Sequence, residues 1–176
     1  MNLSLDPTLR QQQLTAIKTY VEANHSVNGS GVYDQATATA MNQLAAPSHF
    51  VFVTSVSVDN VRKSLDWDEV LNVTTGLTPL QQFGFNTLFS NGDYDPSLES
   101  SRDALVKIFP AGMSNTRAAV LADATKLATI AEKLLSVAGT GPGGGNGSAA
   151  AQSAVLGEGA EGNITVAILQ EAESEG

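Results

Sequence analysis

The sequence contains no cysteine and only two histidines, and these absences exclude much reactive and metal-binding chemistry. Without cysteine the chain has no disulfide, thiolate nucleophile, zinc ribbon or iron–sulfur cluster. His25 and His49 have no histidine or carboxylate three or four residues later, which is the spacing that metal ligation on a helix requires. We interpret both as surface histidines, and the sequence predicts no bound metal and no cofactor.

Cations are also scarce, with nine lysines and arginines against 18 aspartates and glutamates and a net charge of −9. The basic residues are scattered along the chain instead of clustering. A protein that binds nucleic acid normally presents a basic face, so nucleic acid is not the expected main partner. We interpret the acidity as a contribution to solubility.

Long apolar runs are missing. Runs such as Phe50–Val53 are far shorter than the roughly 20 residues of a membrane-spanning helix. The first residues, MNLSLDPTLRQQQ, lack the basic start and apolar stretch of a secretory signal. We therefore expect no membrane partner, and synthesis in the cytoplasm with any release by a signal-free route such as lysis. The apolar content of 42% is typical of a globular protein.

Catalytic and binding motifs are incomplete. The glycines ending at Gly147 are not followed by the lysine of a phosphate-binding loop, and no serine lies in a nucleophile elbow. Alternating oxygen ligands around Asp93 and Asp95 imitate a calcium loop. However, Pro96 stands where that loop needs glycine and Arg102 where it needs a bidentate glutamate. The sequence predicts no catalytic residue and no enzyme, and leaves a weak surface cation site at Asp93 and Asp95 open.

The stretch Gly139–Gly147, read GTGPGGGNG, is the most distinctive feature present. Every lysine and arginine precedes it, whereas five glutamates and no cation follow it. Glycine loses more backbone entropy on ordering than any other residue, so the stretch predicts a flexible linker. We expect a helical body over residues 1–138, a Gly-rich linker over 139–149 and an acidic C-terminal arm over 150–176.

Helix starts are clear in the body. Asp6-Pro7, Thr78-Pro79 and Asp95-Pro96 each pair an N-cap residue with proline at the first helical position, and Asp34 can cap a short helix. Phe50–Val58 is the best strand candidate. The predicted class is mostly α: a single helical domain with at most a short strand pair, plus the linker and an extended C-terminal arm. Apolar spacing predicts helices over 7–23, 34–44, 79–89 and 96–109, and one or two short helices over 58–73.

The longest predicted helix runs from Asn115 to about Val137. Val120, Leu127 and Leu134 recur every seven residues, and alanines lie along the same side. Alanine allows another helix to approach closely, so this helix is expected at the centre of the core or, alternatively, at a subunit interface.

The acidic arm is the expected contact with partners. Its small side chains cannot build a core unaided and its five glutamates repel one another, so we expect it to become ordered against the body or a partner. Trp67 is the only tryptophan and is expected to pack in the body as an anchor. The candidate partner-contact residues are Trp67, Val155, Leu156, Ile164, Val166, Ile168 and Leu169.

Five segments, taken in order, form a longer pattern across residues 30–142. They are Ala46-Pro47-Ser48, Phe52-Val53-Thr54-Ser55-Val56, the Trp-containing Asp66–Val70 leading into Thr75-Gly76-Leu77-Thr78, Asp95-Pro96-Ser97 with Arg102, and Leu134–Gly141. This order resembles that of small uncharacterised proteins encoded among the virion genes of tailed bacteriophages and prophages. The resemblance implies a structural role in the particle, and none of its motifs is catalytic. The longer glycine tract and the more acidic end depart from the pattern.

The expected function is that of a non-enzymatic bacteriophage virion structural protein, of the tail or the head–tail neck. It would be made in the host cytoplasm, reside in the virion, and assemble with other virion proteins and copies of itself. One alternative is a capsid decoration protein. Another is a peptidoglycan-binding or wall-hydrolysing accessory, because Gly31–Leu44 resembles the Gly-x-x-Asp-x-x-Thr helix start of peptidoglycan-binding repeats.

Overall fold

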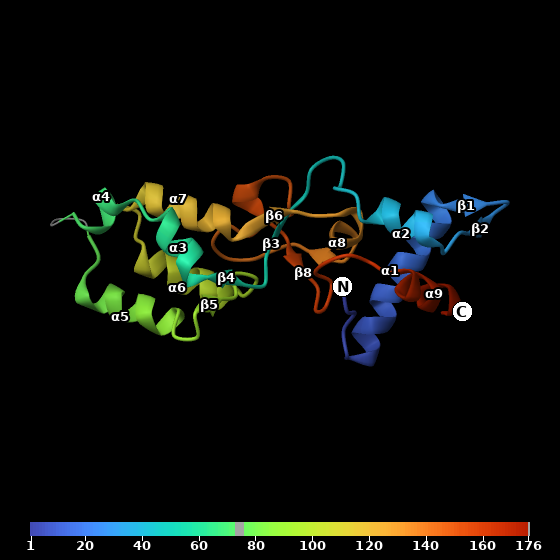
Figure 1. Cartoon of the computed structure of the whole chain (residues 1–176), viewed down its shortest axis with the longest axis horizontal. Helices are drawn as coiled ribbons and strands as arrows, with labels where there is room; N and C mark the ends of the chain where they lie inside the picture. Colours follow the sequence, from blue (N-terminus) through green and yellow to red (C-terminus); the bar gives the residue numbers. More distant parts are fainter. Residues whose placement is uncertain (73–75, 176) are drawn as a thin grey trace. The chain divides into compact units, whose positions relative to one another are not determined.

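The computed structural model describes residues 1–72 and 76–175, which form a mixed α/β fold (Figure 1). Over this part of the chain there are nine α-helices and eight strands of two or three residues, and the strands form four two-stranded sheets. Helix accounts for 48% and strand for 13%. The prediction of a mostly α, single helical domain is therefore wrong. Strands this short leave no alternating pattern in a sequence.

The chain forms two compact units, and each unit combines segments that are distant in sequence. Unit 1 comprises Met1–His49, Leu127–Val137 and Leu156–Gly176, and unit 2 comprises Phe50–Lys126 and Ala138–Val155. This division differs from the predicted boundaries at 138 and 149.

Unit 1 has its core where α1 packs against α9 and α8. The most deeply buried side chains include Leu14, Ile17, Met41 and Leu169, none more than 1% exposed. The elements of unit 1 are α1 (Pro7–Asn24), β1 (Ser26–Val27), β2 (Ser30–Gly31), α2 (Gln35–Met41), α8 (Ile130–Leu134), β7 (Ser136–Val137) and α9 (Val166–Ser174).

Local signals in unit 1 are confirmed. The carboxylate of Asp6 accepts the Leu9 N–H at 2.9 Å and begins α1, and Asp34 accepts the Thr37 N–H at 2.9 Å and begins α2. These caps satisfy amides that have no acceptor inside the helix. A turn after α1 joins the antiparallel strands β1 and β2.

Unit 2 is built from two helix pairs, α5 with α6 and α3 with α7, which lie side by side in Figure 1. Their buried side chains form one apolar cluster that includes Val61, Leu105, Phe109 and Val120. The elements are β3 (Phe50–Phe52), β4 (Val56–Ser57), α3 (Val58–Ser64), α4 (Trp67–Val70), α5 (Pro79–Leu88), β5 (Asp93–Tyr94), α6 (Glu99–Ile108), α7 (Ser114–Asp123) and the 3₁₀ helix η1 (Ala150–Gln152). Strands β6 (Thr125–Leu127) and β8 (Val155–Leu156) have residues in both units.

Predicted starts in unit 2 have mixed outcomes. Helix α5 begins after Thr78, as predicted, and Thr78 forms a capping box with Gln81. The predicted start at Asp95-Pro96 is wrong, because α6 begins at Glu99. The carboxylate of Asp95 instead accepts the N–H of Ser97 at 2.8 Å and closes a turn. Val73 and Thr75, which belong to predicted segments, lie outside the described residues.

The predicted long helix from Asn115 to Val137 is also wrong. Helix α7 ends at Asp123, and the carbonyl of Ala124 accepts the N–H of Val53 at 3.0 Å. A new helix, α8, begins after Thr129, whose hydroxyl forms a capping box with Glu132. The seven-residue repeat of apolar side chains therefore spans two helices and a strand.

The Gly-rich segment, residues 139–149, is a folded loop of unit 2 and not a flexible linker. The Gly139 N–H donates to the Gly145 carbonyl at 2.8 Å, and the Gly145 N–H donates to the Ser153 carbonyl at 2.9 Å. The Phe50 N–H donates to the Gly147 carbonyl at 2.8 Å. Side chains are disfavoured where φ is positive, which explains glycine at Gly141, Gly143 and Gly147.

The C-terminal segment, residues 156–175, docks onto unit 1, so the predicted extended arm is wrong. The side-chain amide of Asn42 binds both backbone groups of Ile164, accepting its N–H at 2.8 Å and donating to its carbonyl at 3.0 Å. The carboxylate of Glu132 accepts the N–H of Gly162 at 2.8 Å. The cation that the segment lacks is supplied by Arg10, which pairs with α9.

Candidate functional site

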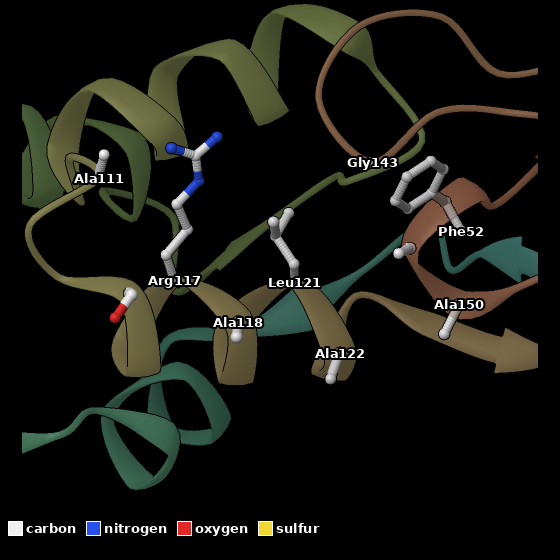
Figure 2. A pocket seen from close by; sticks show the side chains of 10 residues that line it. Phe52, Ala111, Arg117, Ala118, Leu121, Ala122, Gly143 and Ala150 are labelled. Atoms are coloured by element: carbon white, nitrogen blue, oxygen red, sulfur yellow. The ribbon is translucent and has the colours of Figure 1, made fainter.

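An apolar groove in unit 2, which we call the Arg117 groove, is the best candidate site. It has a volume of about 570 Å³, within the range of about 300–1,000 Å³ typical of ligand sites. Figure 2 shows Arg117 and Leu121 projecting from the same side of α7, with the Phe52 ring and Gly143 at the other end. The lining residues are Phe52, Ala111, Ser114, Arg117, Ala118, Leu121, Ala122, Gly143, Ala150 and Ala151.

Helix periodicity explains which α7 residues line the groove. Thr116 and Val120 face the core and are fully buried. Arg117 and Leu121 each follow one of them by one residue, and Ala118 follows Thr116 by two, so these three turn to the adjacent face. Most of the other lining positions are alanine or glycine, whose side chains are short, so a bound chain could approach the backbone closely.

Arg102 fixes the wall formed by the Gly-rich segment. The residue is 1% exposed, and its guanidinium donates to the carbonyls of Pro142, at 2.9 Å, and Thr140. It also donates to the carbonyls of Pro96 and Ser97, at the turn before α6. These four acceptors satisfy a buried cation without a carboxylate.

The same guanidinium positions the Phe52 ring of the groove. The Arg102 Cζ atom lies 4.1 Å from the ring centroid, a cation–π contact. Burial lowers the pKa of Arg102 from its usual value, but the guanidinium stays protonated. A Cβ atom on Gly143 would lie 3.4 Å from the ring, and φ there is +70°. The loop and the ring thus form one preorganised wall.

The start of α7 is held by carboxylates of α4 and of Asp66, the N-cap residue of α4. No side chain of its own caps this helix, and Glu69 accepts the N–H of Asn115 at 3.0 Å and of Thr116 at 2.8 Å. Asp66 accepts the side-chain amide of Asn115 at 3.1 Å. The Thr116 backbone bond is the largest of the effects that lower the pKa of Glu69 from its usual value. An acidic group from a neighbouring helix thus replaces the N-cap.

Arg117 is the only ionisable residue in the lining of the groove. It is partly buried, and within the described ranges no residue accepts a hydrogen bond from its guanidinium or forms an ion pair with it. The groove therefore presents one cation at the side of an apolar surface, with no acid or base nearby in the lining.

A second apolar surface lies on the α5–α6 pair of unit 2. None of the residues of α5 is buried, and the exposed fractions of Leu80 and Phe83 are 79% and 67%. These side chains border a shallow groove of about 450 Å³ that also includes Gly84 and Lys107. Helix α5 carries no charged residue, which is unusual for an exposed helix of a soluble domain.

The predicted contact residues are dispersed in the structure. Trp67 lies on α4 and is 52% exposed, so the prediction that it packs as a core anchor is wrong; Asp66 and Glu69 beside it bind α7, which turns the indole outward. Four of the others are buried and two are partly buried. The buried ones are Leu156, Ile164, Ile168 and Leu169, and the partly buried ones are Val155 and Val166.

The residues that build the groove were not predicted. Arg102 had a usable signal, because it lies three residues before Leu105 and six before Ile108, on the buried stripe of α6. A cation on such a stripe indicates a buried hydrogen-bonding role. Arg117 had no such signal, since its environment comes from segments distant in the chain.

Residues 1–72 and 76–175 contain neither a group of metal-ligating side chains nor a helix able to span a membrane. In these residues no three or more histidine, aspartate or glutamate side chains come together to hold a metal ion. Asp93 accepts a hydrogen bond from Ser55 at 2.7 Å. None of the helices in the same residues combines the length and apolar character that crossing a bilayer requires.

Comparison with known proteins adds no relative. No family model, no curated protein sequence and no solved structure matches this chain.

Proposed function

We propose that this protein is a non-enzymatic structural component of a bacteriophage virion, at the tail or the head–tail neck. It binds other virion proteins and copies of itself, and resides in the particle after synthesis in the host cytoplasm. The virion assignment rests on the segment order described for residues 30–142, and the binding role rests on the surface of unit 2.

The Arg117 groove is the observation that carries the binding role. Its lining is apolar apart from one cation and the Ser114 hydroxyl, and its wall is held rigid by Arg102. Rigid apolar surfaces with few polar groups favour association, because little conformational entropy is lost on binding. General acid–base chemistry needs a titratable pair within reach of a substrate, which this lining does not contain.

The contact surface that we propose is on unit 2, and not on the C-terminal segment. Leu80, Phe83 and Trp67 are exposed there, whereas Ile164 and Leu169 are covered. Aromatic residues that are exposed in the free protein are typical anchors of protein interfaces.

Mass spectrometry of purified particles tests the location. A neck or tail ring predicts about a dozen copies per particle, because such rings have closed cyclic symmetry. Hundreds of copies would favour capsid decoration instead. Absence from the particles, with binding to peptidoglycan in a pull-down or clearing in a zymogram, would contradict the proposal and favour the wall-directed alternative.

Surface variants test the contact. Phe83→Asp places a charge on the exposed apolar face of α5 and should block incorporation into particles without unfolding unit 2. Val27→Asp is a matched control, because Val27 is 61% exposed and lies in unit 1. Incorporation of both variants at the normal level would exclude α5 as a contact.

A further inference from the structure

The Arg117 groove has a feature that selects among partners, namely a cation with no acceptor among the described residues. The sequence has four arginines. Arg10 pairs with Glu171 at 2.6 Å, Arg62 has an acidic partner on its own helix, and Arg102 binds four carbonyls. Arg117 alone has no such partner among the residues that the structure describes, although acidic side chains outnumber cations twofold.

We propose that the Arg117 groove binds a peptide segment of a neighbouring protein in which one carboxylate lies between small or aliphatic side chains. This inference rests on the proposed function and specifies the chemistry of its partner. The carboxylate would accept two parallel hydrogen bonds from the guanidinium, the geometry in which arginine binds carboxylates most strongly.

The apolar part of the lining distinguishes a peptide from a simple anion. A phosphate or acetate ion would contact Arg117 but leave the partly buried Leu121 and the exposed Ala118 in water. A peptide also covers these two side chains, and burial of apolar area supplies the larger share of binding free energy. The alanines beside them let a peptide backbone approach without a clash.

Nucleic acid does not fit the same lining. A nucleic-acid backbone repeats its negative charge and is bound by several cations in a row. The groove has one cation, and the chain has a net charge of −9. A single carboxylate within an apolar segment matches both the charge and the apolar character of the groove.

Magnetic resonance titration of the isotope-labelled full chain tests the inference. The probes are two capped peptides, Leu-Ala-Glu-Ala-Leu and Leu-Ala-Gln-Ala-Leu, and inorganic phosphate. We expect the amide signals of Leu121 and Gly143 to shift with the glutamate peptide. The glutamine peptide should bind about fivefold more weakly, because a charged hydrogen bond is replaced by a neutral one.

Two variants and one control assign the effect to the groove. Arg117→Gln should abolish the preference for glutamate, and Ala118→Phe should block both peptides by filling the groove. Arg62→Gln is the control, because Arg62 is an exposed arginine of unit 2 on another helix, and the preference should persist in it. A spectrum that matches the wild type outside the groove verifies the fold of each variant.

Several outcomes would overturn the inference. These are equal binding of the two peptides, an unchanged preference in Arg117→Gln, or the same shifts with phosphate alone. Shifts at Leu121 and Gly143 that grow with protein concentration in the absence of peptide would also overturn it, because a second copy would then fill the groove. If no peptide binds and the protein is found in particles, this inference fails and the proposed function stands. If the glutamate peptide binds and the particles lack the protein, this inference stands and the proposed function fails.

Discussion

The Gly-rich segment of unit 2 and the C-terminal segment of unit 1 differ in composition, and different forces hold them in place. The Gly-rich segment has few side chains, so its backbone carbonyls bind the buried Arg102 and its amides bind neighbouring backbone. The C-terminal segment instead buries Ile164, Ile168 and Leu169 and adds side-chain bonds to its backbone. A cost in backbone entropy can thus be offset either by one buried cation or by apolar burial.

Replacement of Arg102 should have the largest effect. In Arg102→Met, four carbonyls lose a charged donor, each bond being worth about 1 kcal/mol or more, so the free energy of unfolding should fall by roughly 4 kcal/mol. Hydrogen exchange should accelerate over Gly139–Gly147 and stay unchanged in α9. Urea unfolding and exchange mass spectrometry measure both. Normal protection of the glycines would show that the segment is ordered without Arg102.

Truncation of Leu169 tests the other mechanism. Its side chain is fully buried, and Leu169→Ala should lower the stability of unit 1 by about 3 kcal/mol through lost burial and a cavity. Exchange should accelerate in α9 and α1 while the Gly-rich segment keeps its protection. The exposed Gln170→Ala is the matched control on the same helix. A uniform rise in exchange across both units would mean that the two segments are not held independently.

A smaller loss is expected when the C-terminal segment loses a polar bond. Glu132 is 2% exposed, and its carboxylate accepts the N–H groups of Thr129, at 3.0 Å, and Gly162, at 2.8 Å. In Glu132→Gln the side-chain NH₂ group faces one of these backbone N–H groups, so two donors meet. The free energy of unfolding, measured by chemical denaturation, should fall by about 2 kcal/mol. The exposed Glu173→Gln serves as the reference. Equal stability of the two variants would show that apolar burial alone holds the segment.

Glu69 extends the comparison of holding forces to the surface. Its carboxylate also binds backbone N–H groups, but it is open to water. Hydrogen bonds from the N–H groups of α7 lower its pKa from the usual value, so the ionised form stabilises the folded state. This stability should be complete above the unfolded pKa of about 4.3 and be lost as the pH falls through the lower folded pKa. Thermal unfolding of wild type and Glu69→Gln between pH 7 and 3 measures it. A difference between the two proteins that grows on acidification would contradict the assignment.

The smallest effect is expected at Tyr94. Both Tyr94 and Arg102 carry a buried polar group, but only that of Arg102 has hydrogen-bond partners among the described residues. The Tyr94 side chain is 5% exposed, and its hydroxyl has no hydrogen-bond partner among the described residues. Tyr94→Phe removes a buried polar atom that gains nothing in the fold, so stability should stay within about 0.5 kcal/mol or rise slightly. Calorimetric unfolding decides this, and a loss above about 1 kcal/mol would reveal a hidden partner.

Features set by neighbouring residues could be predicted from the sequence. The caps at Asp6, Asp34 and Thr78 are correct because each side chain reaches an amide two or three residues later. The strand candidate Phe50–Val58 contains β3 and β4, joined by a loop. The capping box from Thr129 to Glu132 was equally readable, and with it the long helix would have been divided correctly.

Features that depend on distant residues could not be predicted. Asp95 looked like a helix cap, but α6 begins only after the turn whose carbonyls bind Arg102. The Gly-rich segment looked mobile because the donor that orders it lies far away in the sequence. Its carbonyls bind Arg102, which is some 40 residues earlier in the chain. The groove is assembled from α7, β3, that loop and η1, and neither charge nor spacing in the sequence associates these four elements.

The carboxylate contacts between α4 and α7 have a practical consequence. Trp67 lies on the same short helix as Glu69, is half exposed, and is the sole indole of the chain. Any displacement of α7 when its groove is filled is therefore transmitted to the surroundings of one fluorophore, whose emission colour and quenching by iodide respond to solvent. The protein thus carries its own optical reporter, and partner binding can be followed in dilute solution without attaching a dye.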